Sequence, residues 1–588
     1  MNEFFQRLKQ RKLVQWAIAY VAAAFAFLQG IDIVGQQFGW PEGVRRGITL
    51  ALVVGFFVTL VLAWYHGERG AQRVTGTELL IIGLVLAVGG GLLWRFASSH
   101  APENKTSAAP NESRTSEPAA VIPEKSVAVL AFANLSEDKG NESFADSVSE
   151  ELLNVLGKVR GLKVTARTSA FHFKGKDIPI PEIARQLGVA YVVEGSVRRA
   201  GDKVRIAAQL IKAADGFQVW SEDFNRDLKD IFAVQEEIAG LIAKNLELKL
   251  GVKPNQAAPN SEAYQLYLEA VRLWGLRDAA SLRQAEQLLL RAIALQPDFA
   301  RAQAAMGFVL SVRSSEENSP AVGDGQALNE QALKWADRAL SLDPDLAEGY
   351  AAKGDALENL GRWTECKEAY RRSIELDPNY ATARQWYARN LAEEGYIEEA
   401  MLQLKRAVAL DPLAPRILDN YGSYLIWLRK YPEAFEILNR ALAIQPNSVQ
   451  ALTFKGVALV RAGRADEGIA ILEPLSRRPD PQDYLPTFLA PALVATGRRR
   501  EAEALLQHPP KDNFYHGVLL CELGRGDEAL ALLKPMISIH RDMLLWTFQE
   551  VMPRKSPEFH RKLAEWGMTE SWQRAEAWRE KNFQTKAP

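Results

Sequence analysis

The sequence has little of the chemistry on which metalloproteins and disulfide-stabilised proteins depend. It holds only two cysteines, Cys366 and Cys521, which stand far apart inside apolar helical patterns and predict buried thiols. Seven histidines are scattered, and none stands at metal-ligand spacing from another ligand. Lys and Arg number 71 against 72 Asp and Glu, so the formal charge of -1 argues against general attraction to nucleic acid. We expect no metal, no cofactor and no nucleic-acid partner.

Motifs of catalysis are absent as well. The sequence contains no GxxxxGK(S/T) phosphate loop, no HExxH and no CxxC. The segment GSVRR lacks the second glycine of a nucleophile elbow. We therefore predict no catalytic residues and no enzymatic activity. The alternative is a catalytic cluster assembled across distant repeats, which sequence spacing does not reveal.

Apolar sequence is abundant at the amino end. About 20 apolar residues cross about 30 Å of hydrocarbon. We predict a membrane anchor over residues 1–97, with three transmembrane helices at about 13–36, 46–66 and 78–97. Asp32 predicts that the last turn of the first helix lies in the interface or faces another helix. Small residues recur every four positions in each span, which would allow close helix packing or a homo-oligomer.

The basic residues around these segments predict their orientation. Most of them stand before the first segment or between the second and third: Arg7, Lys9, Arg11, Lys12, Arg69 and Arg73. This distribution favours a cytoplasmic amino terminus, although Arg45 and Arg46 in the first loop oppose it weakly. Three spans then place the rest of the chain outside the cytoplasm. If the first segment only lies on the membrane surface, the remaining domains are cytosolic.

A flexible linker and a small α/β domain are predicted next. Residues 98–123 are rich in Ser, Pro, Ala, Asn and Glu without a periodic apolar face, which is typical of a flexible linker. Residues 124–252 follow the order β-α-β-α-β-β-β-α, and the last three strands predict an antiparallel meander. Arg167, Ser169 and Lys174 are candidates for binding an anionic ligand, with ordinary loop polarity as the alternative.

The α/β segment resembles a known family. IARQLGVAYVVEGSVRRAGDKVRIAAQLIKAADGFQVWSEDFNRD is similar to the TolB-like amino-terminal domain, and so are VAVLAFANLS, FADSVSEELLNVL and TARTSAFHFKGK upstream. The resemblance implies a domain of bacterial envelope proteins, often joined to tetratricopeptide repeats and to nucleotide cyclases or winged-helix domains. This chain has apolar segments before its linker, so a direct cyclase or DNA-binding role is not expected. We expect a bacterial inner-membrane protein with periplasmic soluble domains.

Helical repeats fill the remaining half. Prolines recur every 34 residues, the tetratricopeptide (TPR) period, at Pro344, Pro378, Pro412 and Pro446. Two columns of small residues keep this interval and predict close helix crossings (Gly354, Ala388, Gly422 and Gly456; Cys366, Ala400, Ala434 and Gly468). We assign residues 260–479 to an all-α TPR solenoid, and residues 480–588 to degenerate hairpins and a C-terminal cap.

Solenoids of this kind bind partners in a groove lined by the first helix of each repeat. The predicted groove residues carry amides, hydroxyls and single charges: Glu348, Asp355, Gln385, Arg389, Asp419, Ser423, Gln450 and Thr453. Such a row suits an extended peptide, or serves only solubility. Trp427 is a candidate anchor, or packs between helices. We predict a membrane-anchored scaffold that binds a protein or peptide; the alternative is a ligand- or peptide-sensing regulator that signals through its membrane helices.

Overall fold

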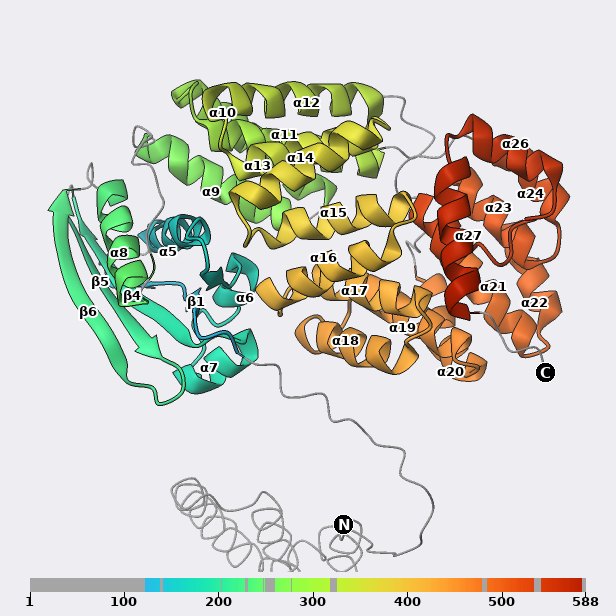
Figure 1. The fold of residues 1–588 in the computed structure, drawn as a ribbon, viewed down its shortest axis with the longest axis horizontal. Helices are drawn as coiled ribbons and strands as arrows, with labels where there is room; N and C mark the ends of the chain where they lie inside the picture. Colours follow the sequence, from blue (N-terminus) through green and yellow to red (C-terminus); the bar gives the residue numbers. More distant parts are fainter. Residues whose placement is uncertain are drawn as a thin grey trace, which may run out of the picture. The chain divides into compact units, whose positions relative to one another are not determined.

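A computed structural model describes residues 122–137, 141–201, 203–227, 231–246, 248, 260–276, 278–317, 325–478, 484–533 and 541–583. The three predicted spans lie outside these residues, as does the predicted linker except for Ile122 and Pro123. No helix in the described ranges is both long and apolar enough to cross a membrane. All of these residues belong to one compact unit, which combines a mixed α/β sheet with a long helical array (Figure 1).

The sheet contains parallel and antiparallel strands in the order β3-β1-β4-β5-β6, and β2 also pairs with β4. Its strands are β1 (Ser126–Val129), β2 (Ala133–Asn134), β3 (Lys163–Val164), β4 (Tyr191–Ala200), β5 (Lys203–Lys212) and β6 (Gln218–Asp227). Strand β1 is parallel to β3 and β4, whereas β4, β5 and β6 form an antiparallel meander. The predicted meander is therefore confirmed, while β2 was not predicted.

Helices cover both faces of this sheet. They are α5 (Glu142–Gly157), α6 (Arg167–Phe171), α7 (Ile180–Leu187) and α8 (Ile231–Asn245). Val127 and Val129 of β1 pack in one core with α5 and α8, whereas Ala128 packs in a second core with α7. Because β1 is buried on both faces, its sequence reads as a continuous apolar run and not as an alternation. The short helix α6 was not predicted.

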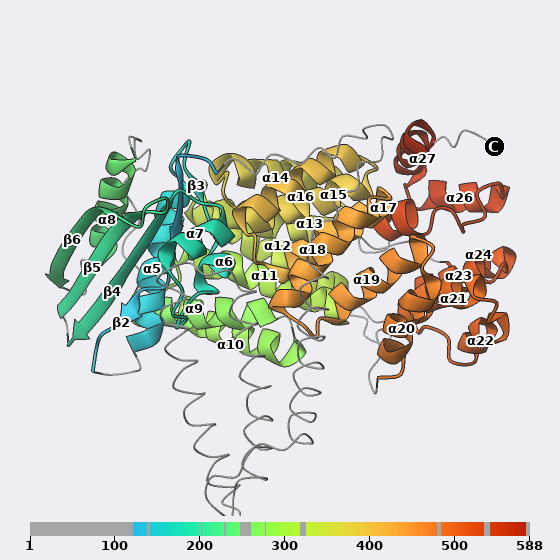
Figure 2. The ribbon, with the colours of Figure 1, turned by 90° about the horizontal axis from the view of Figure 1, so that it is seen from below.

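The array consists of paired antiparallel helices that stack side by side (Figures 1 and 2). Its helices are α9 (Ser261–Leu276), α10 (Ala279–Leu295), α11 (Ala300–Glu317), α12 (Gly325–Leu342), α13 (Ala347–Asn359), α14 (Trp363–Leu376), α15 (Ala381–Glu393), α16 (Ile397–Leu410), α17 (Pro415–Trp427), α18 (Tyr431–Ile444), α19 (Val449–Arg461) and α20 (Ala465–Ser476). Each second helix from α12 to α18 ends two residues before a repeat proline, because proline cannot continue the helix.

Small residues occur where the two helices of a repeat cross closely. A Cβ atom added at Gly354 would lie 2.7 Å from the Tyr370 ring, and one at Gly422 would lie 2.7 Å from Leu438 Cδ2. Protein interiors are too closely packed to absorb such contacts without movement of the helices. The predicted close crossings are therefore confirmed at these positions.

The remaining helices continue the array and then turn back against it. They are α21 (Leu485–Ala495), α22 (Arg499–Ala504), the 3-10 turn η3 (Leu505–Gln507), α23 (Asn513–Glu522), α24 (Gly526–Leu532), the π-helix η4 (Met543–Thr547), α26 (Pro557–Glu565) and α27 (Thr569–Phe583). The pairs α21–α22 and α23–α24 follow the pattern of the repeats before them, whereas η4 and α27 contact helices earlier in the array.

The α/β domain docks on the array through the turns between repeats. Asn379, in the turn after α14, accepts a hydrogen bond from Val164 N at 3.1 Å. Its amide nitrogen donates to the carbonyl oxygens of Gly157 and Leu162, at 2.9 and 3.0 Å. One side chain thus satisfies three backbone groups beside the edge strand β3, which would otherwise lack partners.

A second turn holds helix α6. Asp411, in the turn after α16, accepts hydrogen bonds from the backbone nitrogen of Ser169, at 2.9 Å, and from its hydroxyl group. The Ser169 hydroxyl oxygen accepts in turn from Leu413 N at 2.8 Å, and Ala166 N donates to Leu410 O at 2.8 Å. These two inter-repeat turns therefore fix different parts of the α/β domain.

The three candidate anion-binding residues of the α/β domain have separate partners within the chain. Arg167 faces Glu150, with 2.9 Å between its Nε and a carboxylate oxygen. Lys174 pairs with Asp146 and Glu142, and Ser169 bonds to Asp411. The three residues pair with different carboxylates of the chain itself, so the structure does not gather them around one point. Binding of an anionic ligand by them stays a prediction. Their polarity stabilises the domain and its docking.

Candidate protein-binding site on the inner face of the repeats

The first helices of the repeats, α13, α15, α17 and α19, form one surface, here called the inner face. The predicted groove residues all belong to these helices, but most of them are not open to solvent. Asp355, Gln385, Asp419, Ser423 and Thr453 are buried, whereas Glu348, Arg389 and Gln450 are half-buried. A role of these residues in peptide binding stays a prediction.

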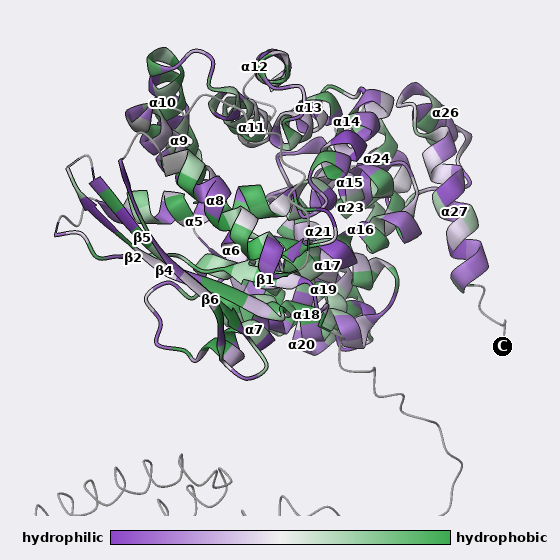
Figure 3. Ribbon diagram, turned by 60° about the vertical axis from the view of Figure 1, so that its left-hand side comes forward, coloured by the Kyte–Doolittle hydropathy of each residue, from purple (hydrophilic) through white to green (hydrophobic). Residues whose placement is uncertain are grey.

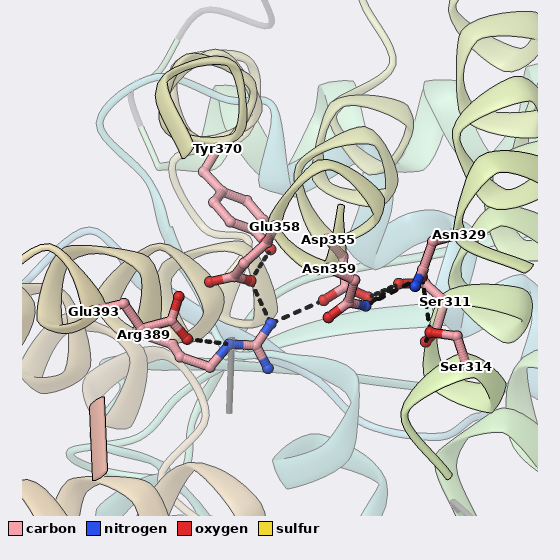
Figure 4. Close-up of polar contacts among 9 residues, drawn as sticks. All are labelled: Ser311, Ser314, Asn329, Asp355, Glu358, Asn359, Tyr370, Arg389 and Glu393. Atoms are coloured by element: carbon pink, nitrogen blue, oxygen red, sulfur yellow. Dashed lines mark hydrogen bonds and ion pairs between the residues drawn. The ribbon is translucent and has the colours of Figure 1, made fainter. Parts of the chain in front are cut away.

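The structure brings two of the predicted residues together. Arg389 on α15 pairs with Asp355 on α13, with 3.0 Å between Nη2 and Oδ1 (Figure 4). The others have separate partners: Ser423 Oγ donates to Asn420 O at 2.9 Å, Thr453 Oγ1 donates to Val449 O at 2.7 Å, and Gln450 accepts from Arg416. The predicted row is thus divided into local contacts within and between neighbouring repeats.

Arg389 is the centre of a polar network (Figure 4). Its guanidinium group also pairs with Glu358, and its Nε lies 3.8 Å from Glu393. The Tyr370 hydroxyl donates to Glu358 Oε2 at 3.0 Å. Burial raises the pKa of Glu358 even though the charge of Arg389 opposes this. Three carboxyl groups thus surround one guanidinium group, and burial favours the protonated form of one of them, Glu358.

The network extends to the preceding repeat through neutral side chains. Ser311 donates to Asp355 Oδ2 at 2.6 Å, and Asn359 donates to Ser311 at 2.9 Å. Ser314 and Asn329 continue the chain of bonds, with 2.8 Å between their oxygen atoms. Sequence reasoning missed Glu358 and Glu393, although their spacing of three and four residues from Asp355 and Arg389 places them on the same helix faces.

The carboxyl-terminal segment contacts the inner face at α15 and continues onto the α15–α16 turn and helix α16. The indole of Trp546, in η4, is buried and donates to Ala392 O on α15 at 2.8 Å. Arg574 Nε on α27 donates to Glu394 O at 2.7 Å, and Trp578 donates to Glu398 at 3.0 Å. Hydrophilic residues dominate α27 (Figure 3), so polar contacts hold much of this helix. The chain itself therefore fills part of the predicted groove.

A cavity remains beside this segment. It measures about 480 Å³ and is lined by α17, α19 and α21 on one side and by η4, Glu550 and α27 on the other. Its aromatic and charged walls include Trp427, Tyr431, Phe454, Phe488, Arg429, Arg461 and Arg579. Trp427 lines the cavity and also stacks on Tyr424, with 4.1 Å between ring centroids. The site therefore combines flat apolar walls with several guanidinium donors, which suits a peptide with both apolar and polar side chains.

In the described ranges, no three His, Cys, Asp or Glu side chains are placed to hold a metal ion.

Comparisons with known proteins agree with the repeat architecture. The tetratricopeptide repeat model matches residues 347–380, which span α13, α14 and the turn after them. The chain is 34% identical over 274 residues to a Rhizobium meliloti (strain 1021) protein named "Putative adenylate cyclase 3". That match covers 46% of this chain, and the chain spans only 46% of that relative.

Several solved structures contain a similar array. A TPR protein of Thermus thermophilus is 18% identical, with 34% of this chain and 99% of that chain covered and a TM-score of 0.29. The protein pilF of Pseudomonas aeruginosa is also 18% identical, with 39% of this chain and 96% of that chain covered and a TM-score of 0.29. YrrB, described as a TPR protein with an unusual peptide-binding site, is 23% identical. That match covers 32% of this chain and 90% of YrrB, with a TM-score of 0.22. Together with the 34-residue period, the family match identifies the chain as one that carries tetratricopeptide repeats.

Proposed function

We propose that this chain is a membrane-anchored scaffold that binds a protein or peptide partner on the inner face of its TPR array. The observation that carries the proposal is the cavity of about 480 Å³ beside Trp427. It lies on the first helices of the repeats, and its aromatic walls and guanidinium groups could bind side chains of an extended segment. The partner would cover the half-buried residues that the inner face still exposes.

The proposed anchor is the apolar region at residues 13–36, 46–66 and 78–97. With a TolB-like α/β domain after the linker, the chain would be a bacterial inner-membrane protein with periplasmic soluble domains. Reporter enzymes fused near Ser116, one active only in the cytoplasm and one only outside it, test this topology. Activity of the cytoplasmic reporter would contradict the periplasmic location and favour recruitment of cytosolic proteins to the membrane.

Site-specific photo-crosslinking tests the binding site. Phe454 lines the cavity, so p-benzoyl-phenylalanine at this position in the full chain should crosslink a partner in intact cells. The matched control is the same substitution at Phe435, which lies on the second helix α18 beneath Arg464. We expect a protein band with the Phe454 probe that the Phe435 probe does not give, and mass spectrometry identifies it. Equal capture by both probes would argue against an inner-face site.

We also propose that the chain is not itself an enzyme. The cyclase name belongs to a relative of which this chain spans less than half. The match says nothing of the chemistry of the part of that relative which lies outside it. The test is incubation of the purified chain with ATP and Mg²⁺ or Mn²⁺, followed by measurement of cyclic AMP. Production of cyclic AMP above that of a heat-denatured sample would contradict this proposal.

A regulatory sensor is the second candidate function. A cavity of about 520 Å³ in the α/β domain favours it, because the cavity is open and lined by polar groups that include Lys176, Glu194 and Gln209. Occupancy there would alter the membrane helices in a sensor, but not in a pure scaffold. Disulfide crosslinking between cysteines introduced into the predicted spans, with and without periplasmic extract, distinguishes the two functions.

A further inference from the structure

One turn of the array departs from the others in its backbone. Glycine occupies the turn between the two helices in five described helix pairs, always with positive φ: Gly361, Gly395, Gly463, Gly497 and Gly524. The equivalent residue of the α17–α18 turn is Arg429, whose φ is 57°. Among the described residues, Arg429 is the only residue other than glycine with positive φ. Arginine is disfavoured in this left-handed conformation, so the contacts of its side chain are of interest.

The Arg429 side chain reaches into the cavity of the inner face. Its Nη2 lies 2.6 Å from Glu550 Oε1, and its guanidinium group stacks on the Phe583 ring at 4.4 Å from the ring centroid. Arg461, at the end of α19, lies 3.5 Å from Glu550, and Arg579 on α27 lies 3.4 Å from it. Three guanidinium groups from three elements therefore converge on one carboxylate.

The cluster has more positive charge than Glu550 neutralises. The side chains that line the cavity include three arginines and one glutamate. Arg554 adds a positive charge within electrostatic range of Arg579. Glu522 lies within range of Arg461 and Glu550, but burial raises its pKa to about 7, so it is only partly ionised at neutral pH and does not cancel the excess. The cavity therefore lies beside a net positive cluster. The three arginines lower the pKa of Glu550 although its burial opposes this, so the carboxylate is ionised at neutral pH.

Ion pairs hold Glu550 in place, but its side chain remains accessible to solvent. The Glu550 side chain is 40% exposed and that of Arg429 is 45% exposed. Ion pairs of this exposure are weak individually. A second carboxylate that entered the cavity would restore the same ion pairs, so the exchange would cost little electrostatic energy.

We propose that Arg429, Arg461 and Arg579 form an anion-binding subsite of the inner face, and that Glu550 occupies it in place of an acidic residue of the partner peptide. This inference rests on the proposed function, because it specifies the chemistry of that partner. The partner carries a glutamate or aspartate next to an aromatic residue. The carboxylate displaces Glu550, and the aromatic ring enters the cavity between Trp427 and Phe454. Glu550 thereby limits binding to partners that compete with it.

Fluorescence anisotropy with the purified full chain tests the subsite. The probe is a fluorescein-labelled hexapeptide in which phenylalanine and glutamate alternate, and its counterpart has glutamine in place of glutamate. Glu550→Gln should bind the acidic probe about tenfold more tightly than the wild type, because the internal competitor is removed. Adding Arg429→Gly should reverse this gain, since glycine suits the backbone but removes one guanidinium group. Glu580→Gln, at an exposed position of the same helix as Arg579, should bind as the wild type does.

A second measurement uses the wild type alone and does not depend on the folding of a variant. Saturating acidic probe should accelerate hydrogen–deuterium exchange of the segment around Glu550, whereas the glutamine probe should not. If Glu550→Gln shows no preference for the acidic probe and exchange in the wild type stays unchanged, Glu550 is a structural ion-pair partner and the inference is overturned. Photo-crosslinking at Phe454 would still report a partner in that case, so the failure of the subsite is distinguishable from the failure of the scaffold function.

Discussion

Docking of the α/β domain on the array should depend on the charge of one buried carboxyl group. Asp411 is 5% exposed, and burial raises its pKa to about 6 despite the hydrogen bonds that it accepts from Ser169. The ordinary value is 3.8, so the docked state binds a proton more tightly than the undocked state. Docking is therefore favoured at low pH and weakens as the pH rises from about 4 to about 6.

The magnitude follows from the shift in pKa. Raising the pKa of Asp411 from 3.8 to about 6 corresponds to about 3 kcal/mol of docking free energy that ionisation removes by pH 7. Asp411→Asn keeps the acceptor oxygen for Ser169 and removes the charge. The new amide group can donate to the hydroxyl of Thr168, which interacts with Asp411 in the wild type. Allowing about 1 kcal/mol for imperfect geometry, we expect Asp411→Asn to stabilise docking by roughly 2 kcal/mol at pH 7.

Hydrogen–deuterium exchange of the full chain measures this docking directly, because the Ser169 amide donates to Asp411. After correction for the intrinsic exchange rate, the Ser169 amide in Asp411→Asn should exchange at least about tenfold more slowly than in the wild type at pH 7. The difference in Ser169 exchange rate between the two proteins should be smaller at pH 5, where the Asp411 carboxyl of the wild type is partly protonated. Asp411→Ala lacks the acceptor and should exchange faster than Asp411→Asn at both pH values. Faster exchange in Asp411→Asn than in the wild type at pH 7, or a ratio independent of pH, would refute the reasoning.

Two substitutions and one labelling experiment test the packing of the described unit. Asn379→Ala removes three hydrogen bonds to the α/β domain and should cost docking about 2–3 kcal/mol, seen as faster exchange along β3 and unchanged exchange in the distant repeats. Gly422→Trp should lower the stability by about 3 kcal/mol or more, because even its Cβ would lie 2.7 Å from Leu438, and an unchanged thermal midpoint would contradict the close crossing. Cys366 and Cys521 are buried, and burial raises the pKa of both thiols, that of Cys521 to about 12. A thiol reagent should therefore label them only when the chain unfolds. Rapid labelling of the native chain would contradict their burial.

Local patterns predicted the parts of the fold that arise from neighbouring residues. The 34-residue spacing of prolines and small residues predicts the helix pair of each repeat, because every repeat packs against its neighbour in the same way. The alternation of apolar and polar residues around two turn signals predicts the meander, because each of its strands also packs against its neighbour in sequence. Both kinds of contact join residues close in sequence, so they leave a periodic trace. Spacing also identified the helix faces that carry the candidate groove residues, but it does not reveal what covers those faces.

By itself, the sequence determined the α/β domain, the repeat period and the helix faces on which a binding surface can form. Only the tertiary structure decided that the carboxyl-terminal segment covers part of that surface. It also decided that Arg429 meets Glu550, 121 residues away, and that Asp411 meets Ser169, 242 residues away. Contacts of such long separation depend on how whole elements stack and turn, and no local periodicity records them. The charge and the accessibility of the inner face are consequently properties of the folded array.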